Sequence, residues 1–326
     1  MAANMGNGYY GMEARAVCTR LVALAGQGDR MGTVHSVFRH AVNVELAGRL
    51  ISLVMEPGSL VPYGCTVGQD QPFPLLGIQQ GDGVKLEPTR LTFSKGPTLW
   101  LSHTTPAELS VDAIPITSFG TENEPEQDKA TSSLQTRLRP ILDLLQAGEE
   151  GLGLSVLVTG GVPNVYATFI APRLKALFAA VGATDGQAVA LAGQSAGCGI
   201  GLTPSSDDLL TGYFLTVRLL SRANRMQDVR ALLPRMAAAA AEKTNRISGA
   251  FLINSGDGLA STHMLTLLEA IFTGAPAQQV RIAAERVAAF GSTSGRDTLT
   301  GVVLAIQHHD GGKNSGQTGN QKERLL

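Results

Sequence analysis

The stretch Gly197–Gly212 reads GCGIGLTPSSDDLLTG, and it predicts a loop that runs into the start of a helix. Its three alternating glycines leave the backbone free to adopt positive φ angles and to expose N–H groups. We expect Thr203 to be the N-cap and Pro204 to be the first helical residue, where a missing N–H costs nothing. An amide-rich loop that leads into a helix N-terminus is the general form of an anion site.

A second stretch, Ser292–Gly301, reads STSGRDTLTG and repeats this pattern. When Asp208 is aligned with Asp297, both stretches fit [ST]-x-S-x-x-D-x-L-T-G, and a glycine precedes each. We therefore expect two similar helix N-termini that face each other, with Gly212 and Gly301 allowing the helices to approach closely. Taken singly, each motif also fits ordinary capping, in which an acid gains only ~0.3–1 kcal/mol from the helix dipole.

The charge of the ligand is left open by three acidic residues, Asp207, Asp208 and Asp297, which would repel an anion unless they cap, bind a cation or orient a donor. One consistent arrangement places amides and hydroxyls on a phosphate or carboxylate, while the aspartates hold Mg²⁺ or a substrate amide N–H. The stretch lacks the lysine of a P-loop, and its glycine spacing differs from the dinucleotide fingerprint. The apolar run Ala188–Ala192 in front of it is compatible with a strand.

Hydrophobic periodicity predicts an α+β fold, with a small β-rich N-terminal domain followed by a mainly α-helical C-terminal domain. Val42, Val44 and Leu46 alternate with polar residues, and Ala47-Gly48 then predicts a hairpin turn into a second apolar run. Further strands are expected at 84–86, 90–93 and 98–102, and helices at 134–145, 164–181, 209–217, 226–243, 258–273, 277–290 and 297–307. We expect the following organisation: 1–30 poorly ordered or accessory, 31–120 the β-rich domain, 121–133 a linker, 134–309 the helical domain and 310–326 a disordered tail.

The composition excludes several classes of protein. The chain has 326 residues, 44% of them hydrophobic, and 26 Lys+Arg against 27 Asp+Glu, which is the opposite of a disordered composition. A net charge of -1 provides no overall attraction to nucleic acid or to anionic lipid. No apolar run approaches the ~18 residues that a membrane span needs. The three cysteines are scattered, so we expect a cytoplasmic protein without disulfides, and neither nucleic acid nor membrane as a partner.

The remaining candidate residues have weaker patterns. The pair His308-His309 adjoins the expected tail and is expected to be solvated rather than to bind a metal. Cys198 has no neighbour that would lower its pKa, so we interpret it as a small loop filler. Arg39 and Asn43 lie four residues apart in a strand-like segment and therefore on one face, which suits either an interdomain hydrogen bond or a polar contact to a ligand, and we expect the structural role.

The two helix-start motifs, together with the early run Phe-Arg-x-Ala-x-Asn at Phe38–Asn43, resemble those of the AllH family over roughly residues 33–309. Ser206 stands where many members have glycine or another residue, and both ends of the chain lie outside the resemblance. The resemblance implies a subunit of an oxamate carbamoyltransferase, in which a carbamoylated nitrogen catabolite and phosphate give carbamoyl phosphate. It also implies two partners, an FdrA-like protein and a second subunit.

The resemblance assigns roles to residues in both motifs. Asp208, Asp297 and Ser205 are the expected catalytic residues. The expected substrate and phosphate ligands are Gly199, Gly201, Thr203, Ser205, Asp207, Ser294 and Gly295, with Arg39 and Asn43 as further candidates. Mg²⁺ is the only cofactor considered, held by Asp207, Asp208 and Asp297. Two alternatives stay open, a non-catalytic scaffold subunit of the same complex and a stand-alone Mg²⁺-dependent hydrolase.

Overall fold

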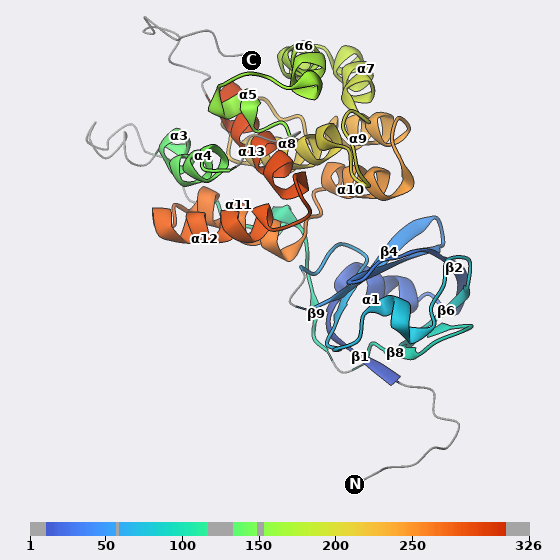
Figure 1. The fold of residues 1–326 in the computed structure, drawn as a ribbon. Helices are drawn as coiled ribbons and strands as arrows, with labels where there is room; N and C mark the ends of the chain where they lie inside the picture. The colour runs from blue at the N-terminus through green and yellow to red at the C-terminus, as the bar shows by residue number, and fades with distance from the viewer. Residues whose placement is uncertain (1–10, 57–58, 103, 117–132, 149–152, 311–326) are drawn as a thin grey trace, which may run out of the picture. The chain divides into compact units, whose positions relative to one another are not determined.

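The computed structural model describes residues 11–56, 59–102, 104–116, 133–148 and 153–310. The chain divides into two compact units, Met1–Leu109 and Ser110–Leu326. Strands dominate the first unit and helices the second, which confirms the predicted α+β fold class (Figure 1). Apart from Ser133, the expected linker lies outside the described residues, as do residues 311–326 of the expected tail.

The first unit contains a 9-stranded sheet in the order β5-β4-β3-β2-β6-β7-β8-β1-β9, and a further pairing of β5 with β1 closes it into a barrel. The strands are β1 (Gly11–Cys18), β2 (Arg30–Val37), β3 (Ala41–Leu46), β4 (Arg49–Met55), β5 (Cys65–Val67), β6 (Gly83–Glu87), β7 (Arg90–Phe93), β8 (Thr98–Trp100) and β9 (Pro106–Ala107). Helix α1 (Thr19–Ala25) and the 3-10 turn η1 (Phe73–Leu76) complete this unit.

The predicted hairpin is confirmed as β3 and β4. Ala47 and Gly48 both adopt positive φ angles, 51° and 73°. This is the backbone conformation that a tight two-residue hairpin turn requires. Val42, Val44 and Leu46 are at most 1% exposed, so the alternating residues form one buried face. The three further strands that the sequence predicts also form, as β6, β7 and β8.

Two sequence expectations for the first unit need correction. Residues from Gly11 onward were expected to be poorly ordered or accessory, but β1 pairs with β5, β8 and β9 and thereby closes the sheet. The reason is its composition, since β1 buries Met12, Ala14 and Val17 against the barrel core. The boundary between the compact units also falls earlier than position 120, between Leu109 and Ser110.

The second unit is built from helices, preceded by the 3-10 turn η2 (Val111–Ala113). The helices are α3 (Leu134–Arg137), α4 (Arg139–Gln146), α5 (Val156–Thr159), α6 (Val165–Ala180), α7 (Asp185–Ser195), α8 (Ser205–Arg222), α9 (Leu233–Ala241), α10 (Arg246–Gly256), α11 (Thr262–Thr273), α12 (Ala277–Ala288) and α13 (Ser294–His309). Within the part of the chain that the structure describes, none of the helices is both long enough and apolar enough to cross a membrane.

Helices α8 and α13 lie between two hydrophobic cores. One core joins them to α5, α6, α7, α9 and α10, and the other joins them to α3, α4, α11 and α12. Figure 1 shows the same arrangement, with α13 running through the middle of the helical unit. Because both faces of α8 are covered, its apolar residues are buried all round, as expected for a central helix.

The helical predictions hold except near the glycine loop. The run Ala188–Ala192, compatible with a strand by sequence, belongs to helix α7. Ala188 and Ala192 are four residues apart and fully buried. They therefore lie on one face of the helix, and their small side chains pack into the core. Helix α10 was not anticipated, because its sequence RISGAFLINSG mixes small polar and apolar residues without a clear stripe.

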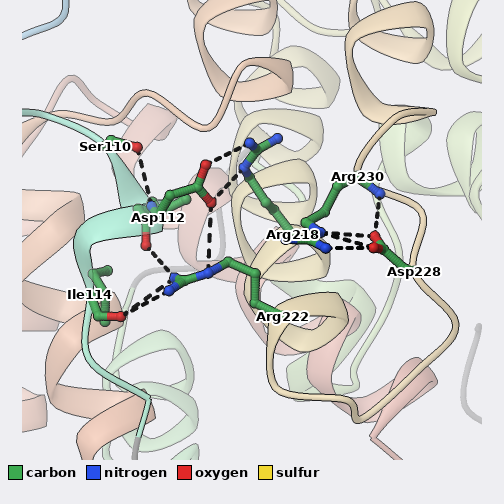
Figure 2. Close-up of polar contacts among 8 residues, drawn as sticks. Ser110, Asp112, Ile114, Arg218, Arg222, Asp228 and Arg230 are labelled. Atoms are coloured by element: carbon green, nitrogen blue, oxygen red, sulfur yellow. Dashed lines mark hydrogen bonds and ion pairs between the residues drawn. The ribbon is translucent and has the colours of Figure 1, made fainter.

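A polar cluster fastens the first residues of the second unit to α8 (Figure 2). Arg218 donates two hydrogen bonds to Asp112, at 2.9 and 2.6 Å, and Arg222 donates one of 2.8 Å to the carbonyl of Val111. The Arg218 guanidinium lowers the pKa of Asp112. Bidentate pairing of this kind gives geometric specificity, so η2 is held in one register against α8.

Candidate functional site

The starts of α8 and α13 meet in the structure. Thr203 Oγ1 and Ser294 Oγ share a hydrogen bond of 2.8 Å across 91 residues of chain. Further along the two helices, a Cβ added at Gly212 would lie 2.1 Å from the Thr298 carbonyl oxygen, and one added at Gly301 would lie 1.9 Å from that of Leu209. The two helices therefore touch backbone to backbone, as the paired glycines predict.

The glycine loop, residues 196–202, folds back against the start of α8. Gly199 has a φ of 130°, and a Cβ there would lie 2.4 Å from the Ser205 amide nitrogen. Gly197 has a φ of 77°, and its Cβ would meet the Lys243 carbonyl oxygen at 2.6 Å. Both positions therefore need glycine on two grounds, the positive φ and the close approach of another backbone segment.

Asp207 and Ser206 hold this loop rather than pointing away from it. Asp207 Oδ1 accepts a hydrogen bond of 2.7 Å from the Gly197 amide, and Asp207 Oδ2 accepts one from the Thr244 hydroxyl. Ser206 Oγ accepts a hydrogen bond of 2.8 Å from the Cys198 amide. Burial raises the pKa of Asp207, and these hydrogen bonds partly offset the effect. The Gly197 amide and the Thr244 hydroxyl therefore occupy the two carboxyl oxygens of Asp207.

The predicted N-cap is wrong by one residue. The cap position of α8 is Pro204, which contributes no side-chain hydrogen bond, and the helix begins at Ser205. Thr203 instead turns its hydroxyl toward Ser294. The Thr203 and Ser294 hydroxyls therefore lie at the junction between the two helices.

Asp208 and Asp297 are the buried carboxyls of this junction. Asp208 is 5% exposed and Asp297 is fully buried. Asp297 Oδ1 accepts a hydrogen bond of 2.6 Å from the Leu154 amide. Burial raises the pKa of Asp297 to about 6, although the Leu154 amide and the nearby Ser205 and Thr293 hydroxyls act in the opposite direction.

The pKa of Asp208 is also raised, well above its ordinary range. Burial is the main cause, and the negative charges of Asp297 and Asp207 add to it, while the Thr203 and Ser294 hydroxyls lower it. Perturbed carboxyls of this kind are concentrated at functional sites, where burial adjusts a group to accept or hold a proton. The junction therefore offers hydroxyl groups, carboxyls that hold protons more strongly than usual, and the N-terminal ends of two helices.

Sequence reasoning missed two contributors to the loop, Thr244 and Asn245. Thr244 donates to Asp207, and the Asn245 side-chain amide donates a hydrogen bond of 2.8 Å to the Leu202 carbonyl. Asn245 also caps α10, because its Oδ1 accepts from the amides of Ile247 and Ser248. The Thr-Asn pair before an apolar segment is a recognisable N-cap signal, but its contact with the glycine loop depends on the packing of α9 and α10.

Other predicted site residues have structural roles. Gly295 allows α13 to approach α12, since a Cβ there would lie 2.0 Å from the Val287 carbonyl oxygen. Arg39 and Asn43 do not share a strand face, because Arg39 lies in the bend between β2 and β3. Asn43 is buried, donates to Ser36 Oγ at 3.0 Å and accepts from Ser52 Oγ at 2.7 Å. The side chain of Asn43 is therefore engaged within the first unit.

The remaining candidates are Cys198 and the pair His308-His309. Burial raises the pKa of Cys198, which agrees with its interpretation as a loop filler. His308 is exposed as expected, but His309 is not solvated, because its Nε2 lies 2.7 Å from the Tyr213 hydroxyl and burial lowers its pKa to about 4. Among the described residues, no group of three or more His, Cys, Asp or Glu side chains is arranged to hold a metal ion.

Comparison with protein families accounts for both units. Residues 196–306, which contain both helix starts, match the family described as oxamate carbamoyltransferase subunit AllH. Residues 13–107, which contain the closed sheet, match the AllH family N-terminal domain. Comparisons with curated proteins and with solved structures found no match. Since the two family matches together cover more than half of the sequence, the chain belongs to the AllH family.

Proposed function

We propose that this chain is a subunit of a carbamoyltransferase and that it supplies the site at which the carbamoyl group is exchanged between a nitrogen catabolite and phosphate. The family description names oxamate carbamoyltransferase, and the word subunit implies a multi-subunit complex. In this proposal the other components are an FdrA-like protein and a second subunit, and the site is the junction between the starts of α8 and α13.

The observation that carries the proposal is the hydrogen bond between Thr203 and Ser294. It joins two motifs that are distant in sequence into one polar junction, and it places the N-terminal ends of two long helices beside each other. Helix N-termini favour negative charge because their first N–H groups lack partners within the helix. Phosphate, carbamoyl phosphate and the carboxylate of oxamate are ligands of this kind.

The proposed reaction follows from these groups. A phosphate oxygen attacks the carbonyl carbon of the carbamoyl group, the bond from that carbon to the catabolite nitrogen breaks, and the nitrogen leaves with a proton. The attack develops negative charge on the carbonyl oxygen, which fixed donors such as the Thr203, Ser205 and Ser294 hydroxyls would stabilise. A carboxyl with a raised pKa is suited to exchange a proton near neutral pH, so Asp208 and Asp297 are the proposed acid–base residues.

The test uses the chain purified together with its two partner subunits. Asp208→Asn and Asp297→Asn should abolish the formation of carbamoyl phosphate while the circular dichroism spectrum stays that of the folded chain. Asp185→Asn is the matched control, because Asp185 also lies in the first turn of a helix but its side chain is 63% exposed.

Full activity of both variants would refute the proposal. If motif substitutions lowered the melting temperature and left the transfer rate unchanged, the scaffold alternative would be correct instead. Activity of the isolated chain that requires Mg²⁺ and releases a hydrolysis product would favour the hydrolase alternative.

A further inference from the structure

Two carboxyl oxygens at the junction lack partners. Within the described residues, Asp208 Oδ2 and Asp297 Oδ2 are buried and accept no hydrogen bond. They come from the first turns of two different helices. Native proteins rarely leave such atoms unsatisfied, because an unpaired buried acceptor costs about 1–3 kcal/mol. Both Oδ2 atoms are therefore open to a ligand, which would supply a donor to an ionised carboxylate and an acceptor to a protonated one.

The chemistry of the missing partners is restricted. Phosphate and carboxylate oxygens are acceptors and would be repelled by an ionised aspartate. The primary amide of a carbamoyl group, in contrast, carries two N–H donors beside one carbonyl acceptor. An amide therefore suits a carboxylate on its nitrogen side and a proton donor on its oxygen side.

The protonation of the two aspartates provides this combination. Burial, with a smaller effect of the charge of Asp297, raises the pKa of Asp208, which favours the protonated form that can donate. The pKa of Asp297 is about 6, so at pH 7 to 8 it is mostly ionised and accepts. Asp207, the third carboxyl nearby, is occupied by Gly197 and Thr244.

We infer that Asp208 and Asp297 form a subsite for the carbamoyl –CO–NH₂ group, in which Asp297 Oδ2 accepts from the nitrogen and Asp208 donates to the carbonyl oxygen. The inference rests on the proposed function, because it names the residues that bind the carbamoyl end of the ligand proposed there. The anionic end would then compete for the Thr203 and Ser294 hydroxyls, which hydrogen-bond to each other and act on Asp208. Recognition of the N–H groups by Asp297 would explain why a buried acid is found where an anion alone would be repelled.

A matched pair of ligands tests the subsite. Carbamoyl phosphate and acetyl phosphate share the phosphate and the carbonyl group, but acetyl phosphate has a methyl group in place of the NH₂. Calorimetric titration of the reconstituted complex in EDTA should show tighter binding of carbamoyl phosphate by about 10- to 100-fold, the range expected for a hydrogen bond to a charged group.

Asp297→Asn should remove this preference for a geometric reason. Because the Leu154 amide donates to Oδ1, the asparagine must place its carbonyl oxygen there and its NH₂ at the position of Oδ2. Two donors would then face each other when carbamoyl phosphate binds. Asp185→Asn, at the exposed helix start, should keep the full preference.

Each outcome decides the question. Equal binding of the two ligands to the wild-type complex would overturn the subsite and leave the proposed function standing. Binding of neither ligand would overturn both. A preference that survives in a folded Asp297→Asn variant, or that appears only when Mg²⁺ replaces EDTA, would also overturn the subsite, because the NH₂ group would then not be recognised by Asp297.

Discussion

Asp297→Asn should change the way in which stability depends on pH. Burial raises the pKa of this carboxyl from 3.8 to about 6 in the folded protein. The folded state therefore binds the proton more strongly than the unfolded state, so stability is highest at low pH and falls as the pH rises from 3.8 to 6. At ~1.36 kcal/mol per pKa unit, the ionised carboxyl costs the folded state about 3 kcal/mol at pH 8. Asparagine keeps an acceptor for the Leu154 amide but cannot ionise.

The assay is urea unfolding of the wild type and of the variant between pH 4 and pH 8. Circular dichroism at the helical band reports the second unit, which contains Asp297. A single curve would not suffice, because His309 acts in the opposite direction: its lowered pKa, about 4, makes stability rise with pH over an overlapping range. The difference between variant and wild type cancels His309 and leaves the contribution of Asp297, including the effect of its charge on Asp208.

We expect the variant to gain about 2.5 kcal/mol relative to the wild type on going from pH 4 to pH 8, because a small part of the ~3 kcal/mol is already lost at pH 4. Most of the gain should appear below pH 7, since the carboxyl is largely ionised above it. Asp185→Asn controls for the loss of a negative charge at a helix start. Parallel curves for wild type and Asp297→Asn would refute the reasoning, because they would mean that Asp297 has the same pKa in the folded and unfolded states.

Two further predictions concern packing and the end of α13. Gly301→Ala should destabilise the helical unit by about 3 kcal/mol or more, because its Cβ would lie 1.9 Å from the Leu209 carbonyl oxygen. Gly186→Ala, where a Cβ meets no atom within 4 Å, should be neutral or stabilise by up to ~1 kcal/mol, so equal melting temperatures for the two variants would contradict the packing argument. The His309 imidazole should titrate near pH 4 in an NMR pH series, and a midpoint near 6.5 would show that it is solvated rather than buried against Tyr213.

The local elements of the fold could be predicted from the sequence. The β3–β4 hairpin follows from three alternating apolar residues and a two-residue turn, and α8 and α13 follow from hydroxyl, acidic and glycine residues at fixed spacing. Such signals act between residues that are close in the chain, so the sequence alone contains them. The close approach of α8 and α13 could also be anticipated, because a glycine at the same place in both motifs leaves room for a second backbone.

The elements that sequence reasoning misjudged depend on distant partners. β1 contains a glycine and two alanines, and it is a strand because β5, β8 and β9 pair with it. The run Ala188–Ala192 is too short for its hydrophobic period to distinguish a strand from a helix. It forms part of helix α7, which packs against α6 and α9. The structural role expected for Asn43 is confirmed, but its partners, Ser36 and Ser52 on the neighbouring strands, are set by the strand register.

The candidate site also combines features that the local sequence predicts with features that depend on contacts between distant segments. The sequence by itself determined that two similar helix starts, rich in hydroxyls and acids, exist in one chain, because capping and spacing are local properties. Only the tertiary structure decided that Thr203 meets Ser294, that Asp207 turns back to hold the loop, and that Asp208 and Asp297 are buried with one oxygen each unpaired. The physical reason is that burial and charge proximity set a pKa, and both arise from contacts between segments that the chain brings together only when it folds.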